Sequence, residues 1–205
     1  IGKTHLYQHG GSKVGSHSKE YIPLMNEWGF DDTDELHGPL ASFRHDSSYT
    51  EHLESKGLLE KHRNYIDHYR KGWAQGTADP WTELPCPLPD EDHLDAYTGR
   101  RTVEWINNYS DEKPFYLQVL FPGPHDPFDS PASYRAMYKP EEMSVGSMEM
   151  PREPVPDNVK FVLKWSGLEG KLTREDKQLM STFYYAKITL IDEYIGKIVK
   201  ALEEK

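Results

Sequence analysis

The sequence has a single cysteine, a shortage of positive charge and no long apolar run. Cys86 is the only cysteine in 205 residues, so an internal disulfide is excluded and the redox compartment stays open. Lys and Arg number 24 against 34 Asp and Glu, a net charge of -10 that argues against general nucleic-acid binding. No apolar run approaches the roughly 20 residues that span a bilayer, so we expect no membrane span.

The beginning of the chain also lacks an initiator methionine and a leader. We therefore expect an internal piece of a longer protein. Its length suffices for one domain or most of one. The localisation of that longer protein is unknown, and a secreted, periplasmic or lysosomal-type compartment is plausible for it. The oligomeric state is not indicated.

Three regions have the apolar spacing of α-helices. Residues 48–70 form the first, with a break at Gly57, and residues 95–109 form the second, with Thr98 as the expected N-cap. The third and longest helix is predicted over residues 173–205. A short helix is also expected around residues 23–28.

Residues 115–121 are almost continuously apolar and rich in strand-forming residues. Such a run, entered directly from a helix, predicts a buried parallel strand and one half of a βαβ repeat. The fold class we expect is therefore α/β with a mostly parallel sheet. Ligands of open α/β sheets bind beyond the carboxyl ends of the strands, which is where His125 falls. Flanking prolines stiffen its loop.

Other polar stretches could be ligand-binding sites or ordinary solvent-exposed segments, and the sequence favours the second interpretation. The glycines of residues 10–15 lack the order of a phosphate-binding loop, and the acidic residues 31–35 lack the spacing of a calcium loop. Solvated loops fit both. Four histidines show no metal-binding spacing and are taken as scattered surface residues: His45, His52, His62 and His68.

Lys3, His5 and His125 are the candidate catalytic residues, and Lys3 and His125 are also the candidate substrate-binding residues. A lysine supplies a fixed positive charge, and an imidazole can donate or accept a proton near neutral pH. Together they could stabilise negative charge on a sulfate or phosphate oxygen. The alternative is that Lys3 and His5 belong to a frayed terminus and that His125 caps backbone in a loop.

Three stretches resemble one family in its own order along the chain. Ile1-Gly2-Lys3-Thr4-His5-Leu6 resembles the Gly-Lys-x-His segment of type I sulfatases, of the alkaline-phosphatase superfamily. Residues 113–128, ending Gly123-Pro124-His125-Asp126-Pro127-Phe128, are similar to the family's strand and active-site histidine loop. Residues 184–198 are similar to the helix that precedes the family's second metal-binding segment.

The resemblance implies an alkaline-phosphatase-like α/β/α sandwich, here incomplete. It implies hydrolysis of sulfate esters, on a sulfated small molecule or glycan, at a divalent metal that is usually calcium. The nucleophile would be a formylglycine made from Cys or Ser. By position, Lys3 and His5 would contact the formylglycine diol, and His5 would help its sulfate adduct collapse. His125 would bind the sulfate and assist the leaving group.

The chain departs from the family pattern in ways that predict a partial catalytic domain. The Cys/Ser-x-Pro-x-Arg segment is absent, Cys86-Pro87-Leu88-Pro89 does not match it, and no metal ligands of the family are found. Thr4 stands where many sulfatases have Trp. We expect residues 1–205 to be an inactive piece of that domain. Within it, residues 8–94 form a loop-rich helical insertion, 95–129 a helix, strand and active-site loop, and 173–205 a long helix. The open rivals are a phosphonate or phosphodiester hydrolase and a non-catalytic binding module.

Overall fold

The computed structural model describes residues 1–6, 16–75, 86–147, 149, 152–166 and 172–205, without the side chains of residues 72–75 and 162–166. The glycine-rich residues 10–15 lie outside this part. The described residues form the α-helices α1 (Ile22–Glu27), α2 (Ser48–Ser55), α3 (Leu59–Gln75), α4 (Leu94–Asn108), α5 (Ala132–Arg135), α6 (Asp157–Ser166) and α7 (Arg174–Glu203). Short 3-10 helices span Ser18–Tyr21, Ala41–Phe43, Asp90–Asp92 and Pro140–Glu142.

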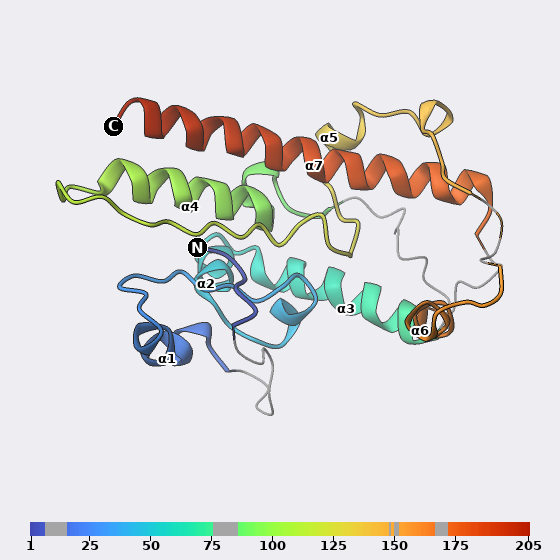
Figure 1. Cartoon of the computed structure of the whole chain (residues 1–205), viewed down its shortest axis with the longest axis horizontal. Coiled ribbons are helices and arrows are strands. Elements are labelled where there is room, and N and C mark those ends of the chain that lie inside the picture. The colour runs from blue at the N-terminus through green and yellow to red at the C-terminus, as the bar shows by residue number, and fades with distance from the viewer. Residues whose placement is uncertain (7–15, 76–85, 148, 150–151, 167–171) are drawn as a thin grey trace.

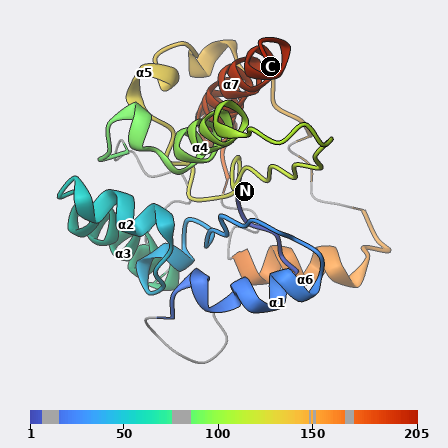
Figure 2. The same cartoon turned by 90° about the vertical axis from the view of Figure 1, so that its left-hand side faces the viewer.

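The helices form two groups. Figure 1 shows α4 and α7 side by side above α1, α2 and α3, and Figure 2 shows the start of the chain between the two groups. At the contact between α4 and α7, a Cβ added to Gly99 would lie 2.5 Å from the Tyr194 ring, so the glycine allows the two helices to approach closely. None of the helices in the described part combines the length and the apolar character that crossing a membrane requires.

Two apolar clusters hold the groups together. One joins α2, α3 and the start of α4, and the other joins α4, α5 and α7. Their buried members are Leu36, Tyr49, Leu53, Leu59, Leu88, Leu94 and Tyr97 in the first, and Ala96, Tyr134, Ala186, Leu190 and Tyr194 in the second. The start of α4 contributes to both clusters, so this helix links the two groups.

The helix predictions are confirmed, with one error at a helix start. The region 48–70 divides into α2 and α3 at Gly57, which has φ +68° and so suits glycine at a helix end. Thr173 caps α7, its Oγ1 accepting a hydrogen bond from the backbone N–H of Asp176 at 3.0 Å. Thr98, by contrast, does not cap α4. The cap is His93, and the hydroxyl of Thr98 donates to the Leu94 carbonyl inside the helix.

The predicted α/β sandwich with a mostly parallel sheet is wrong, because the described residues contain no sheet. Residues 115–121 are extended but form no strand; only Leu120 makes a bridge, with Gly2. Phe115 and Tyr116 are 36% and 81% exposed instead of buried. An apolar run shows that a segment can form a strand, but a strand also needs a partner bonded along its length. Here the pairing is limited to isolated bridges.

Candidate functional site

Gly2 holds the first motif between two distant segments. It forms parallel bridges with Glu35 on one side and Leu120 on the other. Its N–H donates to the Asp34 carbonyl at 3.0 Å, and the N–H of Lys3 donates to the Leu120 carbonyl at 3.3 Å. With φ +109°, a Cβ at Gly2 would lie 2.0 Å from the Leu120 oxygen, so only glycine fits. The close approach brings the Lys3 motif beside the segment that leads to His125.

The Lys3 side chain lies over Gly38, where an added Cβ would be 2.7 Å from its Nζ. Partial burial lowers the pKa of the Lys3 ammonium, and the charges of Glu35 and Asp126 act in the opposite direction. Glu35 is itself buried, and its carboxylate accepts a hydrogen bond from the Thr4 N–H at 3.0 Å. The interpretation of residues 31–35 as a solvated turn is therefore wrong at Glu35, which fixes the main chain between Lys3 and His5.

His5 is exposed and has φ 57°, in the left-handed region where non-glycine residues are uncommon. The charge of Lys3 lowers the pKa of the His5 imidazole, and partial desolvation and His125 lower it further. At neutral pH the imidazole is thus in the form that can accept a proton.

His125 is half exposed, and its Nδ1 faces two acceptors of the next residue. Nδ1 lies 2.8 Å from Oδ1 of Asp126 and 2.6 Å from the carbonyl oxygen of Asp126. Because both neighbours accept, Nδ1 carries the proton and Nε2 is directed away from them. The hydrogen bond to Asp126 raises the pKa of His125. Tyr69 donates to the other carboxylate oxygen at 3.3 Å, which orients Asp126.

The pairing of Gly2 and Lys3 with Leu120 brings the segment of Lys3 and His5 beside the segment that leads to His125. Partial burial lowers the pKa of Lys3, the hydrogen bond to Asp126 raises the pKa of His125, and the charge of Lys3 lowers the pKa of His5. Cationic donors can bind an oxyanion, and a neutral imidazole beside them can accept a proton from a reacting hydroxyl group.

The loop of His125 rests on residues that the sequence analysis missed. Asp95, at the start of α4, accepts a hydrogen bond from the Gly123 N–H at 2.7 Å. A Cβ at Gly123 would lie 2.3 Å from Oδ2 of Asp95, so this contact requires glycine. Lys187 of α7 forms an ion pair with Asp129 at 2.9 Å, and its side chain is 1% exposed. The sequence did offer one sign that Lys187 is buried, because this lysine lies within the apolar stripe of the longest helix.

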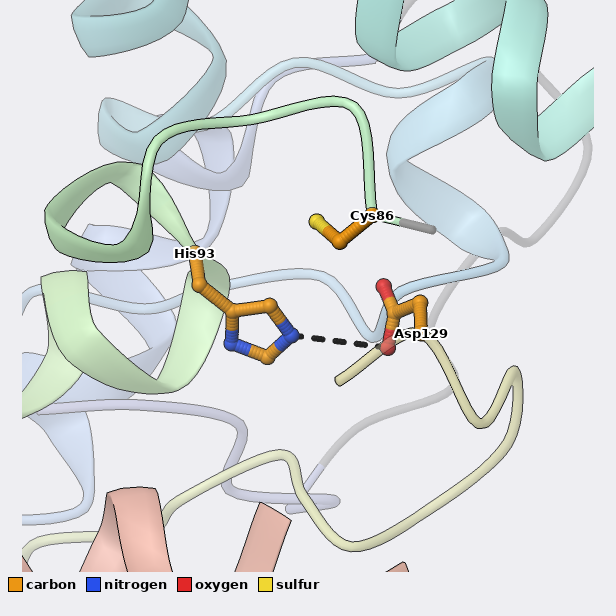
Figure 3. Close-up of side chains that lie close together, drawn as sticks. All are labelled: Cys86, His93 and Asp129. Carbon is orange, nitrogen blue, oxygen red and sulfur yellow. Dashed lines mark hydrogen bonds and ion pairs between the residues drawn. The ribbon is translucent and has the colours of Figure 1, made fainter. Parts of the chain in front are cut away.

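Cys86, His93 and Asp129 were also not predicted to act together. Their potential ligand atoms all lie within 4.8 Å of one another, a spacing that could hold a metal ion. Figure 3 shows the three side chains converging from three segments: the one before the Asp90–Asp92 helix, the start of α4 and the loop that follows His125. Sulfur, nitrogen and a single carboxylate do not fit calcium, which takes about six to eight oxygen ligands.

The hydrogen bonds of this group fit a satisfied network better than a metal site. Nδ1 of His93 accepts from the Asp95 N–H at 3.2 Å, so its Nε2 carries the proton and faces Oδ1 of Asp129 at 3.4 Å. The same oxygen accepts from the Lys187 ammonium. Burial raises the pKa of the Cys86 thiol to about 12, so it is protonated at neutral pH. The cation that neutralises Asp129 is Lys187.

The histidines expected at the surface divide into buried and exposed ones. His45 and His62 are 8% and 4% exposed, so the surface interpretation is wrong for them. Nε2 of His62 lies 2.8 Å from the Ser42 hydroxyl, which donates in turn to the Pro39 carbonyl. His62 therefore donates through Nε2, and burial lowers its pKa to about 4, so it is a neutral structural residue of the core at neutral pH.

Comparison with known proteins gives a family for the whole chain. A family model described as Sulfatase matches residues 1–205. An arylsulfatase of Clostridium perfringens (strain 13 / Type A) is 26% identical over 126 residues, which cover 60% of this chain and 26% of the relative. The multifunctional alkaline phosphatase superfamily protein PehA of Trinickia caryophylli is 28% identical over 136 residues, with the same coverage of both chains. The chain thus spans about a quarter of the length of these curated relatives. It belongs to the sulfatase family of hydrolases.

Proposed function

We propose that this chain supplies the lysine and histidine side of an oxyanion site in a hydrolase that cleaves sulfate esters. The observation that supports the proposal is the bridge between Gly2 and Leu120, which brings the segment of Lys3 and His5 beside the segment that leads to His125, more than a hundred residues later. Membership of the sulfatase family supports sulfate as the oxyanion, and a sulfated small molecule or glycan is the substrate class.

The roles follow from the protonation of each group. Lys3 and protonated His125 bind oxygens of the sulfate group through charge-assisted hydrogen bonds. Nε2 of His125, the nitrogen that does not face Asp126, holds the proton that the leaving oxygen needs. Neutral His5 would accept a proton from a hydroxyl group that reacts beside the bound sulfate. The mechanism we propose uses a formylglycine and a divalent metal, and the described residues of this chain fit neither of them.

The proposal has consequences for how the chain is divided. Residues 95–129 and 173–205 carry and support the histidine loop, and residues 8–94 are an insertion against which Lys3 lies. The 205-residue chain by itself should bind sulfate without hydrolysing sulfate esters, because its sequence lacks the Cys/Ser-x-Pro-x-Arg segment that supplies the family's nucleophile. Turnover of an aryl sulfate by this chain alone would contradict that assignment.

Sulfate binding provides the direct test. Imidazole NMR signals of His5 and His125 should shift as sulfate is added at low ionic strength. Lys3→Met and His125→Gln should each weaken binding about tenfold, the effect of losing one charge-assisted hydrogen bond of about 1.5 kcal/mol. Lys19→Met is the matched control, because Lys19 is exposed and pairs with Glu51 at 2.6 Å. Equal losses in all three variants, or no shift at either histidine, would refute the site.

A second candidate is hydrolysis of phosphonates or phosphodiesters by the same residues. It is favoured by the similarity to a relative named as a multifunctional member of the alkaline phosphatase superfamily. Mass spectrometry of the nucleophile in the full-length protein separates the two. A formylglycine in place of Cys or Ser supports sulfate chemistry, whereas an unmodified threonine supports phosphate chemistry.

A non-catalytic binding module is the remaining rival. It requires that His5 and His125 face no common site, and the bridge between Gly2 and Leu120, which brings their two segments together, supports the opposite arrangement. Turnover by the full-length protein that is lost in His125→Gln would exclude it.

A further inference from the structure

The buried ammonium group of Lys187 donates hydrogen bonds to the loop that contains His125. Nζ donates to the His125 carbonyl at 3.0 Å, to the Pro127 carbonyl at 3.3 Å and to Oδ1 of Asp129 at 2.9 Å. An ammonium has three N–H donors, so all three are used within a five-residue stretch. Lys197, on the same helix, instead pairs with Glu193 at the surface of α7.

Stability alone gives a poor account of this arrangement. Removing two charges from water costs free energy that their attraction only partly repays, and apolar pairs often replace buried ion pairs without loss. Burial opposes the charge on Lys187, and Asp129 and Asp95 restore it, so that its pKa lies above the ordinary value. What an apolar pair could not do is hold the carbonyl groups of His125 and Pro127.

The loop is also held at its other end. Asp95 accepts from the Gly123 N–H, so α4 fixes the loop before His125 and α7 fixes it at and after His125. Fixing the carbonyl of His125 sets the orientation of the residue from which the imidazole projects. The contact between Nδ1 and Asp126 then sets the ring, and Nε2 is directed away from the carboxylate.

We propose that Lys187 is a positioning residue, which holds the loop of residues 125–129 so that Nε2 of His125 faces the oxyanion together with Lys3. The inference rests on the proposed function of His125 and extends it to a residue that does not touch the substrate. Asp129 is the partner that allows the ammonium to be buried, and His93 supports Asp129 through Nε2 at 3.4 Å.

The experiment must separate positioning from stability. Lys187→Met leaves Asp129 buried without its cation and should lower the melting temperature strongly. The double variant Lys187→Met/Asp129→Asn removes both charges and should recover most of that loss, but not the bonds to the two carbonyls. Lys197→Met is the control on the same helix, because that lysine is 48% exposed.

The readouts are the NMR titration of His125 in the 205-residue chain and the kinetics of the full-length protein. In the double variant, the titration of His125 should move towards the ordinary histidine value as its contact with Asp126 loosens. Sulfate binding should weaken about tenfold, and kcat of the full-length protein should fall about a hundredfold with a smaller change in KM, as expected for a misplaced catalytic group.

Each result can be assigned to one hypothesis. If the double variant folds and keeps the wild-type titration of His125 and the wild-type kcat, the positioning role is wrong. If instead the wild-type chain binds no sulfate and the full-length protein has no hydrolase activity, the proposed function fails. The titration of His125 still tests whether Lys187 positions the loop in that case.

Discussion

Gly2→Ala adds one methyl group, which should destabilise the protein and separate the Lys3 segment from the segment that leads to His125. The new Cβ would lie 2.0 Å from the Leu120 carbonyl oxygen and 2.7 Å from its carbonyl carbon. Both are backbone atoms, so no flexible side chain can move aside. The segment that contains Leu120 must retreat by about 1 Å or more to restore van der Waals contact.

The cost can be worked out from the bonds at this bridge. The retreat breaks the bonds from Lys3 N–H to the Leu120 carbonyl and from Leu120 N–H to the Ile1 carbonyl, each worth about 0.5–1.5 kcal/mol. Alanine at φ +109° adds strain of about 1–3 kcal/mol. The sum is roughly 2–6 kcal/mol. This is a large part of the roughly 5–15 kcal/mol of unfolding free energy that typically stabilises a domain.

Urea unfolding followed by far-UV circular dichroism measures this cost. Gly196→Ala is the matched control, because Gly196 lies within α7 and a Cβ there meets nothing within 4 Å. That variant should gain up to about 1 kcal/mol from helix propensity. In Gly2→Ala the pKa of His5 should also rise towards its ordinary value as Lys3 and His125 move away. A Gly2→Ala variant within about 0.5 kcal/mol of wild type would refute the close approach on which the site depends.

Three further predictions concern single titratable groups. Asp126→Asn removes the carboxylate that raises the pKa of His125, so the NMR titration of His125 should move to lower pH; an unchanged midpoint would exclude the pairing. Burial lowers the pKa of His62 from 6.5 to about 4, so its contribution to stability is complete above pH 6.5 and is lost as the pH falls towards 4. His62→Gln should remove roughly 3 kcal/mol of acid sensitivity in that window, measured as unfolding free energy against pH, and an equally steep loss in the variant would contradict the assignment. Cys86 is only partly buried, but its pKa is raised to about 12, so it should react with a thiol reagent at pH 8 much more slowly in the native chain than in the unfolded one; equal rates would contradict the raised pKa.

The helices and the order of the functional motifs were available from the sequence. Helix formation depends on neighbours three and four residues apart, so the periods of residues 48–70 and 173–205 were sufficient to locate α2, α3 and α7. The Gly-Lys-x-His and histidine-loop motifs were likewise recognisable as short local patterns. The sulfatase family could be inferred from these motifs without knowing how they meet, and the family model matches the whole chain.

The tertiary structure decided what depended on distant partners. The apolar run 115–121 had the composition of a buried strand, but a strand requires another backbone beside it, and the described residues provide one bridge at Leu120. His62 was predicted to lie at the surface, but tertiary packing buries it. Lys187 and Asp129 are 58 residues apart, and they form a pair only because α7 packs beside the histidine loop in the folded chain. The sequence alone determined the chemical groups and the helices that carry them; only folding decided which charges are buried, because burial and pairing are set by contacts between distant residues.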